Sequence, residues 1–165
     1  MNDLGTMTLH GTTRTLRFER VLDHPPTEVW SALTEPASLG EWLAAAEVEP
    51  GPEGTITLDF GEGGIEKCRI TLWDPPRALA YEWNFLGEKP THVSWELETV
   101  SDGAATRLTL EHTLLDAGVA PDYGAGWHAH LDQLAGHLAG DTPEWGDLFE
   151  TLRPRYAELA ESSTA

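Results

Sequence analysis

Cysteine and cationic side chains are scarce in this sequence. Cys68 is the only cysteine among 165 residues, so an intrachain disulfide and a cysteine-based metal cluster are both excluded. Ten Lys and Arg residues stand against 28 Asp and Glu residues, which gives a formal net charge of −18. Such a charge repels the phosphates of nucleic acids and the anionic surface of membranes. We therefore expect no nucleic-acid partner, no membrane insertion, and no need for a metal or another cofactor.

Long apolar runs are also absent. No stretch approaches the length of a membrane span, and residues 1–12 lack the basic and apolar regions of a signal peptide. These absences predict a cytoplasmic location. Hydrophobic residues, by contrast, make up 40% of the chain, and tryptophan occurs seven times. This composition predicts a folded domain with a substantial core.

Alternation of apolar and polar residues predicts an antiparallel sheet. The segments that alternate are Thr15–Leu22, Thr55–Phe60, Ile65–Trp73, Leu79–Phe85, Val93–Leu97 and Thr106–His112. Short turn-forming segments separate the last five, and such short connections are typical of antiparallel strands. Because the alternation leaves one face of each strand apolar, that face needs a cover.

Helical patterns supply this cover. Two short helices are expected after the first strand, over Thr27–Leu33 and starting at Pro36. Apolar residues at helical spacing predict a long helix over Asp122–Ala139. A last helix follows it, in which Pro154 should produce a kink or an early end. The sequence therefore predicts an α+β fold in which a curved antiparallel β-sheet wraps around a long C-terminal α-helix.

Four segments in this order resemble the START/SRPBCC superfamily, and particularly the activator domain of the heat-shock protein 90 ATPase. They are LDHPPTEVWSALTEPASLGEWL (22–43), DPPRALAYEW (74–83), TRLTLEHTLL (106–115) and GWHAHLDQLAGHLAG (126–140). The resemblance covers residues 14–140 and implies a helix-grip fold with a cavity between the sheet and the long helix. In such proteins this cavity commonly accepts a hydrophobic small molecule. We assign 14–160 to a single SRPBCC-like domain, 1–13 to a flexible leader and 161–165 to a frayed tail.

Candidate ligand-binding residues are those whose position in a strand or helix points them into this cavity. They are Phe60, Ile70, Tyr81, Trp83, Trp95, His112, Trp127 and Leu131. Arg20 has the same parity and is either a polar clamp on the ligand or turned outward by a bulge. His112 is either a ligand-bonding or acid–base group or a structural histidine. Glu66 is expected at the rim of the cavity, and Cys68 in the core.

The favoured hypothesis is non-catalytic binding of a hydrophobic or aromatic small molecule. One alternative is an aromatase/cyclase-like enzyme, in which His112 with Tyr81 or Arg20 positions and protonates a polyketide-like substrate. Another alternative, implied by the resemblance, is a chaperone-associated or stress-related protein-interaction module. A homodimer could form through an exposed edge strand at Thr55–Phe60. A zinc site is not expected, because His128 and His130 lie on opposite faces of their helix.

Overall fold

The protein is built around an antiparallel sheet of eight strands. The computed structural model describes residues 4–83 and 90–162. The strands are β1 (Thr6–His10), β2 (Thr13–Leu22), β3 (Ala45–Glu49), β4 (Thr55–Asp59), β5 (Ile65–Asp74), β6 (Ala78–Trp83), β7 (Thr91–Val100) and β8 (Ala105–Asp116). The helices are α1 (Pro26–Thr34), α2 (Pro36–Trp42), α3 (Ala120–Ala139) and α4 (Trp145–Ser162). Short 3₁₀ turns occupy Gly61–Gly63 and Ser101–Gly103.

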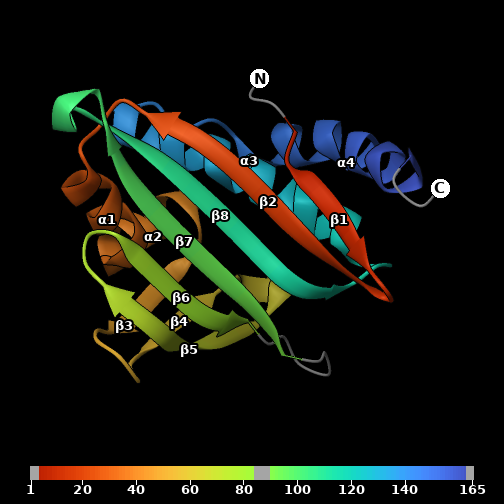
Figure 1. The fold of residues 1–165 in the computed structure, drawn as a ribbon, viewed down its shortest axis with the longest axis horizontal. Helices are drawn as coiled ribbons and strands as arrows, with labels where there is room; N and C mark the ends of the chain where they lie inside the picture. The colour runs from red at the N-terminus through yellow and green to blue at the C-terminus, as the bar shows by residue number, and fades with distance from the viewer. Residues whose placement is uncertain (1–3, 84–89, 163–165) are drawn as a thin grey trace.

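The long helix α3 lies across the inner face of this sheet. The strands pair in the order β1-β2-β8-β7-β6-β5-β4-β3, and each pairing is antiparallel. Figure 1 shows α3 behind β2, with α4 on the side of β1, while α1 and α2 lie beside one end of β7. The predicted helix-grip fold, with two short helices ahead of most of the strands, is confirmed.

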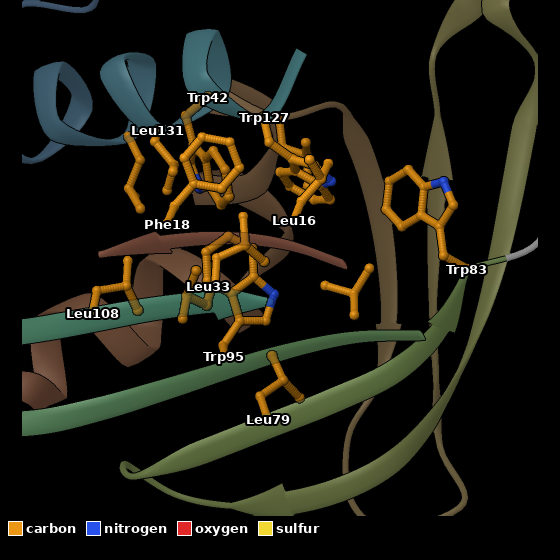
Figure 2. Close-up of a cluster of buried hydrophobic side chains, with 14 of the residues drawn as sticks. Leu16, Phe18, Leu33, Trp42, Leu79, Trp83, Trp95, Leu108, Trp127 and Leu131 are labelled. Carbon is orange, nitrogen blue, oxygen red and sulfur yellow. The ribbon is translucent and has the colours of Figure 1, made fainter. Parts of the chain in front are cut away.

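The core lies between the sheet and α3, as the alternation along the strands predicts. Leu16 and Phe18 of β2 and Trp95 of β7 are each at most 1% exposed. Trp127 and Leu131, one turn apart on α3, are each 3% exposed and close the core from the other side. Figure 2 shows these side chains gathered between helix and strands, with Trp83 at the edge of the cluster beside the end of β6. Apolar burial on this scale is the main force that holds the layers together.

Regular elements begin earlier and end later in the chain than the sequence suggests. Residues 1–13 were expected to form a flexible leader, but Thr6–His10 is strand β1 and pairs with β2. Met7 is 5% exposed, so the strand is held by packing as well as by its ladder of hydrogen bonds. Of the expected frayed tail at 161–165, the first two residues belong to α4, and 163–165 lie outside the described residues.

Two predictions about individual elements are wrong. Thr55–Phe60 was expected to be an exposed edge strand, but β3 pairs with β4 and covers it. Pro154 was expected to kink or shorten the last helix, yet α4 continues through it to Ser162. The predicted strand end at Phe85 lies outside the described residues.

None of the helices in the described part of the chain is both long enough and apolar enough to cross a membrane.

A candidate ligand pocket at the first half of α3

A pocket of about 230 Å³ opens beside the first half of α3. Its walls come from the residue that follows α2, from the ends of β4 and β6, and from one face of α3. We call it the ring pocket, and its lining residues are Leu43, Phe60, Trp83, Asp122, Tyr123, Gly126, Trp127 and His130. Half of these residues are Phe, Trp or Tyr, and His130 adds an imidazole ring. Asp122 is exposed at the mouth, whereas Trp83 and Trp127 are buried.

The aromatic rings of the pocket meet at angles instead of stacking face to face. The ring centroids of Trp83 and Trp127 are 5.3 Å apart with their planes at 59°. Phe60 and Trp83 are 6.0 Å apart, also at 59°. Rings that stack cover one another's faces, whereas in a tilted pair only the edge of one ring lies against part of its neighbour's face. The arrangement is suited to hold an apolar or aromatic group.

A second hollow, of about 420 Å³, adjoins the ring pocket and shares Leu43, Phe60 and His130 with it. We call it the acidic hollow, because Glu41 and Asp59 lie in its wall. Its complete lining is Gly40, Glu41, Trp42, Leu43, Ala44, Asp59, Phe60, His130, Gln133 and Trp145. A molecule that filled both spaces would pass between an apolar and a polar environment.

The predicted binding residues divide into two groups. Phe60, Trp83 and Trp127 line the ring pocket. The remaining five do not line either hollow and are at most 3% exposed in the core; these are Ile70, Tyr81, Trp95, His112 and Leu131. Parity along a strand identified which side chains point inward, but not which of them border a space.

His112 is a structural histidine in a chain of buried hydrogen bonds. The indole Nε1–H of Trp127 donates to Nδ1 of His112 over 2.9 Å. Nε2 of His112 lies 2.7 Å from Oγ1 of Thr91, whose hydroxyl donates to the carbonyl of Trp83 over 2.8 Å. Nδ1 acts as an acceptor, and the hydroxyl hydrogen of Thr91 is already used in the bond to the carbonyl of Trp83. Nε2 must therefore carry the hydrogen of the neutral ring and donate it to Oγ1 of Thr91. Burial lowers the pKa of His112 to about 3, so the ring is neutral at physiological pH.

The other inward polar residues of the sheet are also buried. The Tyr81 hydroxyl accepts a hydrogen bond from the indole of Trp95 over 2.9 Å, and burial raises the pKa of Tyr81. Cys68 is fully buried, as expected of a core residue, and burial raises the pKa of its thiol, so it is a poor nucleophile. Glu66 was expected at the rim of the cavity but is 0% exposed, because β4 and β5 pair there and carry it into the interior.

Arg20 does not reach the ring pocket. β2 is regular at this position, since its register shift lies between Arg14 and Leu16, so no bulge turns Arg20 outward. Its guanidinium donates to the carbonyl of Glu19 and lies 5.7 Å from the ring of Phe18. Arg20 therefore lines neither hollow, and the structure offers no support for a clamp on a ligand there.

His130 is the most chemically versatile residue of the pocket, and sequence reasoning missed it. Its Nδ1 lies 3.0 Å from the carbonyl of Trp42, which can only accept, so Nδ1 carries the hydrogen and Nε2 is an acceptor. Its ring lies 4.2 Å from that of Trp145 on α4. Burial lowers the pKa of His130 to about 4, against smaller opposing effects from its bonds to Trp42 and Gln133. At neutral pH His130 adds no charge to either hollow.

Helical spacing could have identified this face of α3. Tyr123 and His130 each lie three or four residues from Gly126 and Trp127, which places the four on one side of the helix. Leu43 could not have been found in the same way, because it enters the wall only through the fold of α2 against α3. Within residues 4–83 and 90–162, no group of three or more His, Cys, Asp or Glu is placed to hold a metal ion.

Comparison with known proteins places this chain in a family. Residues 23–139 match the sequence model of the family described as "Activator of Hsp90 ATPase homolog 1-like protein". The match spans more than half of the chain. The chain belongs to this family. The resemblance seen in the four sequence segments is thereby confirmed, and the matched region contains every residue of the ring pocket.

Two proteins with solved structures are similar in fold across nearly the whole chain. The protein encoded by gene BPP1335 of Bordetella parapertussis is 31% identical, with a TM-score of 0.74 over 90% of this chain and 86% of that one. CalU16 of Micromonospora echinospora is 25% identical, with a TM-score of 0.76 over 94% of this chain and 95% of that one. Among curated proteins, an uncharacterized protein of Mycobacterium tuberculosis is 28% identical over 99 residues, which are 52% of this chain and 67% of the relative.

Proposed function

We propose that this protein binds a small apolar or aromatic molecule in the ring pocket without transforming it. The observation that carries the proposal is the aromatic lining of a preformed space between α3 and the ends of β4 and β6. Ligand sites are typically concave and largely apolar, with few polar groups to orient the bound molecule. Here those groups are His130 and Asp122.

The volume of the pocket limits the size of the bound group. An engineered apolar cavity of about 150 Å³ holds benzene, and pockets for drug-sized ligands begin near 300 Å³. At about 230 Å³, the ring pocket suits one ring with a small substituent. A larger ligand would extend into the acidic hollow, with which the ring pocket shares three residues.

The buried titratable groups argue against a cyclase-like reaction in this pocket. Both ring nitrogens of His112 are used by Trp127 and Thr91, and its low pKa means that the ring lacks the second proton with which an imidazolium acts as an acid at neutral pH. Tyr81 is bonded to Trp95 and lies outside the pocket lining. An acid–base group needs to reach the atom that it protonates, and neither of these residues does. Binding alone therefore accounts for the arrangement better than catalysis does.

A pocket-filling variant tests this function directly. Gly126 lines the ring pocket, and a Cβ atom at this position would have only the rings of Trp145 and Phe149 within 4 Å, at 3.9 and 4.0 Å. We expect 2-phenylethanol, a neutral one-ring probe, to shift the indole NMR signals of Trp83 and Trp127 in the native protein. In Gly126→Leu the same titration should leave these signals in place, because the leucine side chain occupies the space.

The matched control for this test is Gly126→Ala, which adds one methyl group and should retain most of the affinity. Unfolding in urea must show that both variants are folded. If 2-phenylethanol shifts signals equally in the native protein and in Gly126→Leu, the probe binds elsewhere and the proposed function is wrong. Native mass spectrometry of the protein from its own source would then identify any ligand that it carries.

The family match supports a second candidate, contact with an Hsp90-type chaperone, because the family is described by Hsp90 activation. A binding partner of this kind would work in the cytoplasm, as the sequence predicts. Co-purification with Hsp90 from the source organism, together with stimulation of its ATPase, is the result expected if this candidate holds. Purified Hsp90 whose ATPase rate is unchanged by an excess of this protein would count against it.

A further inference from the structure

The charged residues around the two hollows are predominantly acidic. Asp122 lines the ring pocket, and Glu41 and Asp59 line the acidic hollow. Neither Lys nor Arg lines either space within the described part of the chain. His130, the one basic residue that borders both, is held neutral by burial, which lowers its pKa to about 4. A bound molecule would therefore meet negative charge and no positive side chain in the walls.

The aromatic walls act in the same direction as these carboxylates. The face of an aromatic ring carries negative electrostatic potential, and it attracts a cation within about 6 Å of its centroid. Phe60, Trp83 and Trp127 are set at angles near 59°, so they are not stacked on one another, and all three border the ring pocket. A cation at the boundary of the two hollows would lie between ring faces on one side and carboxylates on the other.

Two features oppose this field, and neither cancels it. Arg153 of α4 lies 3.4 Å from the carboxylate of Asp122, but both groups are at least half exposed and the pair is screened by water. The first turn of α3 has a partial positive charge of about half a unit. Asp122 lies in that turn and offsets it. Within residues 4–83 and 90–162, the carboxylates of Glu41 and Asp59 form no ion pair with a basic side chain.

We infer that the ligand is an amphipathic organic cation, with an aromatic or branched aliphatic group in the ring pocket and an ammonium group directed into the acidic hollow. This inference rests on the proposed binding function and adds the charge of the ligand to it. The shared residues Leu43, Phe60 and His130 place the two environments within one small molecule's length. Carboxylates of fatty acids and of other anionic ligands would meet repulsion at the same position.

Three probes that differ mainly in charge test the inference. They are 2-phenylethylamine, which is a cation at neutral pH, 2-phenylethanol, which is neutral, and 3-phenylpropanoate, which is an anion. Isothermal calorimetry and the indole NMR signals of Trp83 and Trp127 report their dissociation constants. We expect the amine to bind about tenfold more tightly than the alcohol, which corresponds to about 1.4 kcal/mol, and the anion most weakly. Added salt should narrow the difference.

The result separates this inference from the function on which it rests. If the alcohol or the anion binds as tightly as the amine, the cationic ligand is refuted and the proposed binding function stands. If none of the three shifts the tryptophan signals at millimolar concentration, both are refuted. If the amine binds most tightly and the order compresses in salt, the inference is supported.

A pair of amide substitutions identifies the groups responsible. In the double variant Glu41→Gln with Asp59→Asn, the preference for the amine over the alcohol should fall by at least threefold, while the affinity for the alcohol stays unchanged. Asn at position 59 keeps the acceptor oxygen that Asp59 offers to the backbone N–H of Gly61. The control removes two exposed carboxylates that line neither hollow, with Asp102→Asn and Glu158→Gln. Equal loss of preference in both double variants would refute a role for Glu41 and Asp59.

Discussion

At the scale of single residues, partners decide what a buried polar group can do. His112 was the most suggestive catalytic candidate in the sequence, because it is a histidine at a buried strand position. In the structure Trp127 and Thr91 occupy its two nitrogens, and burial keeps it neutral. It joins α3 to the strand pair β6–β7 that carries Trp83. Its role is thus to position the two tryptophans that line the ring pocket.

A single hydroxyl completes this chain of hydrogen bonds, so its removal should be costly. Thr91→Val leaves the Nε2–H of His112 buried without its acceptor. We expect a loss of about 1–3 kcal/mol in the free energy of unfolding, because a stranded buried donor loses its hydration without compensation. Urea unfolding measures the loss. The pocket signals of Trp83 and Trp127 should also broaden in NMR spectra, because their common anchor is weakened.

Thr106→Val is the matched control for this prediction. Thr106 is also buried, but its hydroxyl donates to the carbonyl of His24 in a partly buried contact, and its removal strands no N–H donor. We therefore expect a smaller loss than in Thr91→Val. Equal losses in the two variants would mean that the His112 network contributes no more than an ordinary side-chain hydrogen bond.

Parity predicted which residues are buried, but not which of them border the pocket. Trp83, Trp95 and Trp127 all point inward, and all are buried. Trp83 and Trp127 border the space, whereas Trp95 packs against Trp42 with ring centroids 6.1 Å apart. Whether space remains beside a side chain depends on what the other elements bring to the same place. That information lies in tertiary packing and is not contained in the spacing of one strand.

At the scale of elements, the missed strands share a physical cause. β1 and β3 are the two edges of the sheet, with five residues each. The segment of β3 is rich in Ala and Glu, which favour helix, and it follows directly on α2. Each of these strands is stabilised by backbone hydrogen bonds to the strand beside it. The pattern of residues within the segment does not show that such a partner strand is available. The inner strands show a clear alternation of apolar and polar residues, which is why the fold could be predicted from the sequence.

Two glycines of α3 should respond to the same substitution with opposite signs. A methyl group at Gly124 would lie 2.7 Å from the ring of Tyr156, whereas at Gly126 the nearest rings are 3.9 Å away or more. Gly126→Ala should therefore raise the free energy of unfolding by about 0.5–1 kcal/mol, through helix propensity alone. Gly124→Ala should lower it by about 1–3 kcal/mol, because overpacking outweighs that gain.

The packing around Tyr156 explains why it cannot move aside for a methyl group at position 124. Its hydroxyl accepts a hydrogen bond from the backbone N–H of Gly5 over 2.8 Å and lies 2.8 Å from Nδ1 of His128. These contacts join the residue that precedes β1 to helices α3 and α4 at one point. Urea unfolding of Gly124→Ala and Gly126→Ala measures whether the free energy of unfolding changes in opposite directions. A stabilised Gly124→Ala would show that α4 shifts freely against α3, contrary to this packing.

At the scale of the whole molecule, stability should depend on pH through buried neutral histidines. Burial lowers the pKa to about 3 for His112 and to about 4 for His128 and His130, from an ordinary value of 6.5. Between these values the unfolded chain binds protons that the folded chain does not. The contribution of these histidines to the free energy of unfolding is therefore complete above pH 6.5 and is lost as the pH falls toward 4.

A second effect of acid has the opposite sign and acts at lower pH. The net charge of −18 gives the folded chain strong self-repulsion at neutral pH. Carboxylates take up protons mostly below about pH 5, and this relieves the repulsion. Added salt screens the repulsion throughout but leaves the buried histidines largely unaffected. The interval from pH 6.5 to 5, in high salt, therefore isolates the effect of the histidines.

His130→Asn measures the contribution of one histidine in this interval. The asparagine amide can still donate to the carbonyl of Trp42, so the hydrogen bond made by Nδ1 is kept. Urea unfolding between pH 7 and 5 should show a slope of stability against pH that is shallower in the variant by up to about 1.4 kcal/mol per pH unit, the value for one proton. Identical slopes for the two proteins would mean that His130 takes up its proton in the folded state as readily as in the unfolded chain. Its neutrality at the boundary of the two hollows would then have to be abandoned.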